Sequence, residues 1–125
     1  MGKNDEHMTK VLVVEDNPLN MELVIEMLRG QGFIADEAID GEDAIKKADT
    51  EAYDLIFMDI EIPIIDGIEA AKAIRKKHKN IPIIALTSYA MKGDRERFLA
   101  AGFDEYMSKP IGVTDFQKRL EKYRK

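Results

Sequence analysis

The sequence predicts an α/β fold: a doubly wound, five-stranded parallel sheet with helices on both faces. Short apolar runs that suit buried strands alternate five times with stretches whose apolar residues recur at helical spacing. Such alternation is typical of a parallel sheet, because the chain returns to the same end of the sheet through each helix. The length of 125 residues fits one domain.

The first predicted strand is the apolar run KVLVVED (10–16), and a helix follows it. Asn17 is expected to cap this helix, and Pro18 suits the first helical position, where a backbone N–H has no partner to lose. Gly30 or Gly32 is expected to end it. Four apolar residues at helical spacing mark the face that should be buried: Met21, Val24, Ile25 and Leu28.

The second and third units repeat this pattern. FIADEA (33–38) is predicted to be a short strand, and Asp40 is the expected cap of a weaker helix that ends near Thr50. The third strand is DLIFMD (54–59), and the third helix is GIEAAKAIRKKHK (67–79). The second helix should point three apolar residues inward: Ala44, Ile45 and Ala48.

The last two units complete the predicted sheet. IPIIALTS (81–88) and EYMSK (105–109) are the fourth and fifth strands, and KGDRERFLAAG (92–102) lies in the helix between them. The final helix is predicted to begin at a capping box formed by Thr114 and Gln117. Its inward residues should be Phe116, Leu120 and Tyr123.

Composition excludes several classes of protein. The absence of cysteine excludes disulfides, thiolate metal sites and cysteine nucleophiles, and His7 and His78 are too far apart for a histidine metal cluster or a hydrolase triad. The net charge of −5 argues against broad nucleic-acid binding. No apolar run is long enough to cross a bilayer. We therefore expect a cytoplasmic protein.

The amino terminus is expected to lie outside the fold. Residues 1–7 are polar and aperiodic, and Met8 opens the patterned region. We interpret residues 1–7 as a leader and residues 8–125 as the domain.

Polar side chains gather at the carboxyl ends of four predicted strands. In chain order these strands end in Glu15–Asp16, Asp59, Thr87 and Lys109. Parallel strands share an end, so these five side chains should meet at one rim of the sheet. Ligands of open α/β sheets bind at this rim, where the strand order reverses.

This convergence favours a magnesium site and phosphoryl transfer. Like charges about 4 Å apart repel by about 4 kcal/mol at an effective dielectric of about 20, and such crowding raises carboxyl pKa values unless a cation relieves it. Oxygen ligands without sulfur or imidazole suit Mg²⁺. Asp59 can then act as the nucleophile that forms an aspartyl phosphate. Lys109 and the metal would neutralise the phosphoryl oxygens, and Thr87 would donate a hydrogen bond to one of them.

Each of these residues taken alone has an ordinary structural interpretation. An acid at a strand end is usually solvated, Thr87 suits a turn, and a lysine before a proline suits an exposed loop. Only the conjunction over four strands favours a function.

Other charged residues are interpreted structurally: 75–79 (RKKHK) as a solvated helix face, Asp66 as a helix cap, and Asp36, Asp54 and Asp104 as surface residues.

Four segments carry a resemblance to a known family: VLVVEDNPLN, DLIFMDIEIPIIDG, IPIIALTSYA and DEYMSKPI. Together they span the chain from Lys10 to the final helix, and they resemble the receiver domain of two-component response regulators. The stretch AMKGDRERFLAAGFDEYMSKPI is most similar to single-domain regulators of the cell-cycle type and to the receivers of hybrid sensor kinases. The resemblance implies a flavodoxin-like, CheY-like sheet with strand order 2-1-3-4-5.

The resemblance also implies a metal site and a phosphoacceptor. In the family, the aspartate matching Asp59 accepts a phosphoryl group from a kinase phosphohistidine. The residues matching Glu15 and Asp16 hold Mg²⁺ together with that aspartate, and the residue matching Glu61 contributes its backbone carbonyl. Mn²⁺ is expected to substitute for Mg²⁺.

The switch and the partners follow from the same resemblance. Residues matching Thr87 and Lys109 bind the phosphoryl group, and the aromatic residue matching Tyr106 changes rotamer on activation. The expected partners are a sensor histidine kinase or a histidine phosphotransferase as donor, and a downstream protein on the face of the fourth helix, fifth strand and fifth helix. The chain would work as a monomer or a phosphorylation-dependent dimer, without binding nucleic acid or membrane.

The chain is therefore expected to be a switch that catalyses only its own phosphorylation and dephosphorylation. Because it ends about one helix after KPI, it is expected to have no output domain. A receiver fragment of a hybrid histidine kinase, or an intermediate of a phosphorelay, stays open as an alternative.

Three positions depart from the common pattern of the family or vary within it. Ile62 replaces the methionine that is common before Pro63, a conservative change. Glu61, two residues after the phosphoacceptor, and Tyr89, two residues after Thr87, adjoin the route of the hydrolytic water in this family. We expect Tyr89 to shield the phosphoryl group and lengthen its lifetime. The effect of Glu61 can have either sign, because its carboxylate can repel the phosphoryl group or orient water.

Two other functions compete with this interpretation. A phosphatase of the haloacid dehalogenase type also uses Asp, Thr or Ser, Lys and magnesium, but it needs an aspartate where Glu61 stands. A flavodoxin-like flavin binder needs a loop rich in Ser, Thr and Gly after the first strand, where EDNPLN would repel phosphate. Acetyl phosphate with magnesium separates these: incorporation at Asp59 favours the switch, sustained phosphate release the phosphatase, and yellow protein the flavin binder.

Overall fold

The computed structural model describes residues 8–88 and 94–124, so the expected leader and the start of the helix predicted from residue 92 lie outside the described residues. The strands are β1 Lys10–Val14, β2 Ile34–Ala38, β3 Leu55–Asp59, β4 Ile83–Thr87 and β5 Glu105–Ser108. The helices are α1 Pro18–Gly30, α2 Gly41–Thr50, α3 Gly67–Lys77, α4 Asp94–Ala101 and α5 Val113–Tyr123. None of the described helices is long and apolar enough to cross a membrane.

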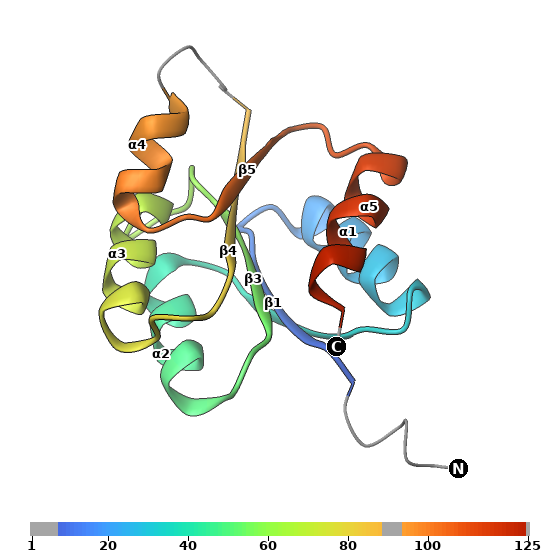
Figure 1. Cartoon of the computed structure of the whole chain (residues 1–125), viewed down its shortest axis with the longest axis horizontal. Coiled ribbons are helices and arrows are strands. Elements are labelled where there is room, and N and C mark those ends of the chain that lie inside the picture. The colour runs from blue at the N-terminus through green and yellow to red at the C-terminus, as the bar shows by residue number, and fades with distance from the viewer. Residues whose placement is uncertain (1–7, 89–93, 125) are drawn as a thin grey trace.

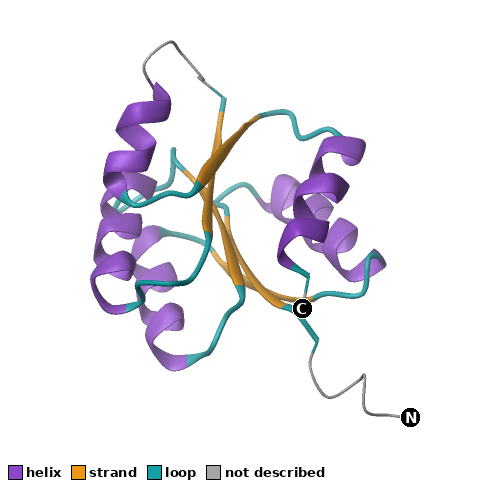
Figure 2. Cartoon of the chain, in the orientation of Figure 1, coloured by secondary structure: helices purple, strands orange, loops and turns teal. Residues whose placement is uncertain are grey.

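The five strands form one parallel sheet in the order β2-β1-β3-β4-β5, which confirms the predicted fold class. Helices α2, α3 and α4 cover one face, and α1 and α5 cover the other (Figure 1). Figure 2 shows the sheet as a middle layer between these two helical layers. The strand order reverses between β1 and β3, so the carboxyl ends of these two strands mark the switch point of the sheet.

The central strands are buried on both faces, and their alternate residues supply two separate cores. In β3, Ile56 and Met58 pack toward α2, α3 and α4, while Leu55 and Phe57 pack toward α1 and α5. A strand buried on both faces has no polar side, which explains the continuous apolar run in the sequence. The run ends at Asp59, where the strand reaches the rim.

Helix caps and buried faces agree with the sequence-based predictions. The four apolar residues predicted on the inner face of α1 are all buried. Three predicted caps accept a hydrogen bond from the backbone N–H three residues on: Asn17 from Asn20 (3.0 Å), Asp40 from Asp43 (2.8 Å) and Asp66 from Glu69 (2.9 Å). These bonds satisfy N–H groups that have no partner inside the helix.

The predicted start of the last helix is wrong. Helix α5 begins at Val113, with Gly112 as an N-cap that makes no side-chain bond. The first turn closes through Phe116 N and Gly112 O at 2.9 Å, so Thr114 already lies inside the helix rather than at its cap. A capping box contributes only about 1 kcal/mol, which is too little to set a helix start against the packing of a buried face. That face is as predicted, since Phe116 and Leu120 are buried.

Arg75 corrects the prediction that residues 75–79 form only a solvated face. Its side chain is 22% exposed and pairs with Asp104 Oδ2 at 2.9 Å. The same Asp104 oxygen accepts from Ile83 N at 2.8 Å, at the start of β4. The Arg75 guanidinium also donates to four backbone carbonyls: those of Gly102 (2.6 Å), Ile81 (2.7 Å), Lys79 (2.9 Å) and His78 (3.3 Å). Asp104 is exposed, as predicted, but it also helps to join α3, β4 and the loop before β5.

Candidate functional site at the carboxyl ends of the strands

Backbone pairing places the rim residues. Glu15 N donates to the last carbonyl of β2 (3.0 Å), and Lys109 N donates to Thr87 O (2.8 Å), so pairing continues one residue past these strands. Asp59 ends β3 and lies opposite Leu86 of β4, which places Thr87 one position further along. The sheet therefore brings the predicted residues to one edge, as the parallel arrangement requires.

Three carboxylates converge at this edge. One oxygen of each lies within 4.8 Å of the others, and they belong to Glu15, Asp16 and Asp59. Glu15 is 3% exposed and Asp59 is 2% exposed, whereas Asp16 is exposed to solvent. Buried carboxylates at this spacing need a compensating cation. An all-oxygen set of donors fits Mg²⁺.

Lys109 supplies one compensating charge. Its Nζ lies 2.8 Å from Asp59 Oδ2 and 3.3 Å from Glu15 Oε1. Its side chain is only 17% exposed, and its peptide bond to Pro110 is cis. The ammonium thus bridges the two buried carboxylates.

Burial and neighbouring charges shift two pKa values in the site. The pKa of the Glu15 carboxyl is raised, first by burial and then by the charge of Asp59, against the opposing effects of the Asn17 N–H and Lys109. Burial alone would lower the pKa of Lys109, but its hydrogen bond to Asp59 and the charges of Asp59 and Glu15 raise it. The charge of Asp59 thus adds to the effect of burial on the pKa of Glu15, and Lys109 is charged at neutral pH.

Gly67 packs directly on the phosphoacceptor candidate. Its N–H donates to Ile60 O at 3.0 Å, where the loop after β3 turns into α3. A Cβ at Gly67 would overlap the Asp59 carbonyl oxygen and lie 2.8 Å from Ile60 Cα. The sequence predicts Gly67 only as the first residue of the third helix, after the cap Asp66. Its position just after an acid-ended strand was the available signal of a close approach.

Glu61 contacts both the acid and the threonine of the rim. Its backbone N–H donates to Asp59 Oδ1 at 3.1 Å, and its carboxylate Oε2 accepts from Thr87 Oγ1 at 3.3 Å. Thr87 is 2% exposed, whereas Glu61 is exposed to solvent. The sequence did not predict this side-chain bond, because 26 residues separate its partners.

Tyr106 lies on the α4 side of the sheet. It stands opposite Ala85 of β4, and its ring centroid is 5.6 Å from that of Phe98 in α4. It is partly buried against the core under α2, α3 and α4. Tyr89, the other aromatic residue singled out in the sequence, lies outside the described residues.

Fold and site together define the class of this protein. It is a doubly wound domain whose switch point holds a cluster of acids bridged by a lysine. Residues 11–121 match the family described as the response regulator receiver domain. The chain belongs to this family, as the resemblance of its motifs predicted.

Curated relatives are of two kinds. Polar-differentiation response regulator DivK of Brucella abortus is 40% identical over 119 residues, which cover 93% of this chain and 97% of DivK. Hybrid signal transduction histidine kinases G and I of Dictyostelium discoideum are 40% and 47% identical over 119 and 111 residues. Those matches cover 91% and 82% of this chain but only 4% and 6% of the kinases. Receivers similar to this chain thus occur both alone and inside long kinases.

Three solved structures have the same fold. The receiver domain of a sensor histidine kinase from Pseudomonas aeruginosa, with magnesium coordinated in its active-site cleft, has a TM-score of 0.86 and 38% identity, and the match covers 94% of this chain and 98% of that one. Response regulator TrrA of Thermotoga maritima, in complex with Mg²⁺ and BeF, has a TM-score of 0.85 and 39% identity, covering 93% and 99%.

The third structure is a complex. It contains the Saccharomyces cerevisiae histidine phosphotransfer signaling protein Ypd1 and the receiver domain of its downstream response regulator Ssk1. The match has a TM-score of 0.87 and 30% identity, and covers 93% of this chain and 88% of that one. Solved relatives of this fold therefore include complexes with magnesium, with Mg²⁺ and BeF, and with a histidine phosphotransfer protein.

Proposed function

We propose that this chain is a switch that accepts a phosphoryl group on Asp59. One Asp59 oxygen attacks the phosphorus of a donor phosphohistidine; the O–P bond forms as the P–N bond breaks, and the electron pair leaves with the imidazole. The observation that carries this proposal is the 2.8 Å pair between Lys109 Nζ and Asp59 Oδ2 inside a cluster of three acids. Buried ion pairs are weak stabilisers of a fold, which favours a chemical role. The chain catalyses only its own phosphorylation and dephosphorylation.

We assign the metal site to Glu15, Asp16, Asp59 and the backbone carbonyl of Glu61. Mg²⁺ suits these oxygens, and Mn²⁺ can replace it. When bound, the cation neutralises charge on the transferring phosphoryl group. The buried Glu15 and Asp59 carboxylates already stand close together, so little rearrangement is needed when a cation enters.

Lys109 and Thr87 are assigned to the phosphoryl group itself. The Lys109 ammonium already contacts Asp59 Oδ2, so it can pair with a phosphoryl oxygen once Asp59 is phosphorylated. The Thr87 hydroxyl, at the end of the neighbouring strand, can donate to a second oxygen. Both groups act by hydrogen bonding and charge, so neither has to transfer a proton.

The proposed donor is a sensor histidine kinase or a histidine phosphotransferase. A hollow of about 510 Å³ adjoins the site, with Glu15 and Lys109 in its wall. The rest of its lining is mostly apolar, including Leu23, Val24, Met27, Ile111 and Val113. A donor helix that buries these side chains would bring its phosphohistidine to Asp59. A single-domain regulator like DivK and a receiver of a hybrid kinase or phosphorelay are both compatible with this arrangement.

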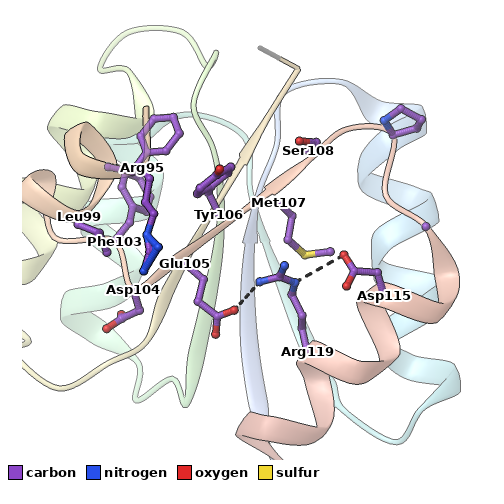
Figure 3. A pocket seen from close by; sticks show the side chains of 13 residues that line it. Arg95, Leu99, Phe103, Asp104, Glu105, Tyr106, Met107, Ser108, Asp115 and Arg119 are labelled. Carbon is purple, nitrogen blue, oxygen red and sulfur yellow. Dashed lines mark hydrogen bonds and ion pairs between the residues drawn. The ribbon is translucent and has the colours of Figure 1, made fainter. Parts of the chain in front are cut away.

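The proposed output surface is the face of α4, β5 and α5, and Figure 3 shows the groove of about 510 Å³ along it. Tyr106 lines this groove, and Glu105 of β5 pairs with Arg119 of α5 across it. Tyr106 lies two residues before the position opposite Thr87, so movement of Thr87 toward a phosphoryl group can change the packing of Tyr106. A downstream protein would read this change.

The remaining assignments concern where the domain acts and how long it stays phosphorylated. We propose a cytoplasmic monomer or phosphorylation-dependent dimer that contacts no nucleic acid, in keeping with its net charge of −5.

We also propose that Glu61 and Tyr89 tune the phosphoryl lifetime. Tyr89→Ala is expected to shorten that lifetime, timed by loss of phosphoprotein after the donor is removed. An unchanged or longer lifetime would contradict the role of Tyr89.

The proposed function is tested with acetyl phosphate and Mg²⁺, with intact mass as the readout. The unmodified chain is expected to gain one phosphoryl group, and peptide mapping should place it on Asp59. Asp59→Asn should abolish the gain. Asp66→Asn is the matched control, because it makes the same change in an exposed helix cap seven residues on, and it should be phosphorylated normally. Phosphorylation of Asp59→Asn, or none in the unmodified chain, would overturn the proposal.

A further inference from the structure

We propose that the Glu61 side chain holds the Thr87 hydroxyl in the unphosphorylated protein and releases it when Asp59 carries a phosphoryl group. This inference rests on the proposed function, because it concerns the hydrogen bond that Thr87 would give to that group. It makes Glu61 a positioning residue, acting through Thr87, that sets the balance between the two forms of the switch.

Backbone pairing places Glu61 within reach of Thr87. Ile60 N donates to Leu86 O at 2.9 Å, so the chain stays paired with β4 for one residue beyond Asp59. Glu61 N then donates to Asp59 Oδ1 at 3.1 Å, which ties the next residue to the rim. Its Oε2 lies 3.3 Å from Oγ1 of Thr87, the residue that follows Leu86. One residue thus contacts the phosphoacceptor through its backbone and the switch threonine through its side chain.

The hydroxyl of Thr87 cannot serve both states at once. A threonine hydroxyl has a single proton and donates one hydrogen bond. Thr87 therefore cannot donate to Glu61 and to a phosphoryl oxygen on Asp59 at the same time. The two acceptors also repel each other, since the Glu61 carboxylate carries one negative charge and a phosphoryl group carries about two.

The acceptor Glu61 and the donor Thr87 differ in how well water can replace their bond. Glu61 is exposed, so its carboxylate is hydrated at once when it turns away from Thr87. Thr87 is 2% exposed, so its hydroxyl needs a partner inside the protein in either state. Exchange of Glu61 for the phosphoryl group satisfies the buried hydroxyl throughout, and it releases only a residue that water can solvate.

It follows that Glu61 opposes the phosphorylated form. Glu61→Ala is expected to tighten the binding of beryllofluoride with Mg²⁺, a phosphoryl mimic, by about twofold to tenfold, the range of one net hydrogen bond. Glu61→Gln keeps an acceptor oxygen but loses the charge, so its gain should be smaller than that of Glu61→Ala. Both changes leave the backbone carbonyl assigned to the metal in place.

A double-mutant cycle isolates the bond to Thr87. Beryllofluoride affinity is measured by calorimetry at saturating Mg²⁺ for the unmodified chain, Glu61→Ala, Thr87→Ala and the double variant. In the Thr87→Ala background the hydroxyl is absent, so Glu61→Ala should gain at least about twofold less than in the unmodified background. Glu69→Ala is the control, because it removes one exposed acid whose ion pair is with Lys72, and it should leave the affinity unchanged.

The outcomes separate this inference from the proposed function. Equal gains in both backgrounds would show that Glu61 acts by charge alone, and weaker binding by Glu61→Ala would show that it supports the phosphoryl group; either overturns the inference. No binding of beryllofluoride by the unmodified chain would instead overturn the proposed function.

A second measurement avoids the substitution of the buried Thr87. In the free protein, the NMR signal of the Thr87 methyl group is expected to move in Glu61→Ala toward its position in the beryllofluoride complex, and not in Glu69→Ala. If the Thr87 signal does not move in Glu61→Ala, the Glu61 side chain does not hold the Thr87 hydroxyl and the inference is wrong.

Discussion

Lys109 Nζ and Asp59 Oδ2 form an ion pair of 2.8 Å between side chains that are 17% and 2% exposed and 50 residues apart in sequence. The same ammonium lies 3.3 Å from Glu15 Oε1. One cation therefore partly balances two buried acids, and the third acid, Asp16, leaves the site with a surplus of negative charge. That surplus is what a divalent cation would neutralise, so we expect the stability of the domain to depend on the metal.

Lys109→Met should expose this dependence. Without Mg²⁺ the two buried carboxylates lose their partner, so the free energy of unfolding is expected to fall by about 3 kcal/mol, and Mg²⁺ should restore part of it. Urea unfolding with and without Mg²⁺ measures both effects. Lys118→Met, on the exposed side of α5, should change stability by less than about 0.5 kcal/mol. Equal losses in the two variants would contradict the prediction.

Gly67→Ala is expected to disturb the site through the backbone of Asp59. The new Cβ would overlap the Asp59 carbonyl oxygen, so the end of β3 or the start of α3 must shift. We expect a loss of about 2 kcal/mol in stability, together with weaker Mg²⁺ binding. Gly30→Ala is the matched control, since its Cβ would meet nothing within 4 Å. Normal metal affinity in Gly67→Ala would argue against this coupling.

Ile64→Gly is expected to stabilise the protein. Ile64 has φ of 71° and is 72% exposed, so a β-branched residue adopts the left-handed conformation with little burial to offset the strain. Glycine removes a cost of about 1–2 kcal/mol, and a net gain of about 1 kcal/mol should raise the unfolding midpoint. Ile39→Gly, at a position 61% exposed without positive φ, should lower it instead. A lower midpoint for Ile64→Gly would count against strain in this loop.

Glu105→Gln should make the free energy of unfolding depend less on pH in the acid range. Burial alone would raise the pKa of Glu105, but the Tyr123 hydroxyl and the charges of Lys122 and Arg119 outweigh it and lower this pKa. A carboxyl with a lowered pKa stabilises the fold fully above its ordinary value of about 4.3, and this contribution is lost as the pH falls toward the lowered pKa.

Urea unfolding at pH values between about 7 and about 3 tests this prediction, because that range spans the ordinary carboxyl pKa of about 4.3. The unmodified chain should lose stability across the acid part of this range more steeply than Glu105→Gln, which should be less stable at pH 7. Tyr123→Phe removes one of the donors and should have a partial effect. An equally steep loss of stability in the acid range in all three proteins would show that Glu105 does not contribute.

Local signals along the chain were enough to predict the order of elements and the membership of the rim. Asn17, Asp40 and Asp66 were recognisable as caps because a cap bonds only three residues ahead. The rim was predictable because parallel strands share an end, so the residues at or just after the ends of β1, β3, β4 and β5 must lie at the same edge whatever the side-chain packing. Thr114 failed as a cap because the packed face of α5, and not its first polar residues, sets where that helix begins.

What the sequence determined by itself was the parallel α/β architecture and the kinds of group that meet at its switch point, because periodicity and strand order depend on neighbours along the chain. Tertiary structure alone decided that Arg75 joins α3 to Asp104, that Gly67 packs on the Asp59 carbonyl, and that Glu61 accepts from Thr87. The Arg75 and Glu61 bonds join residues 29 and 26 positions apart, and such contacts follow from the packing of whole elements rather than from any local pattern.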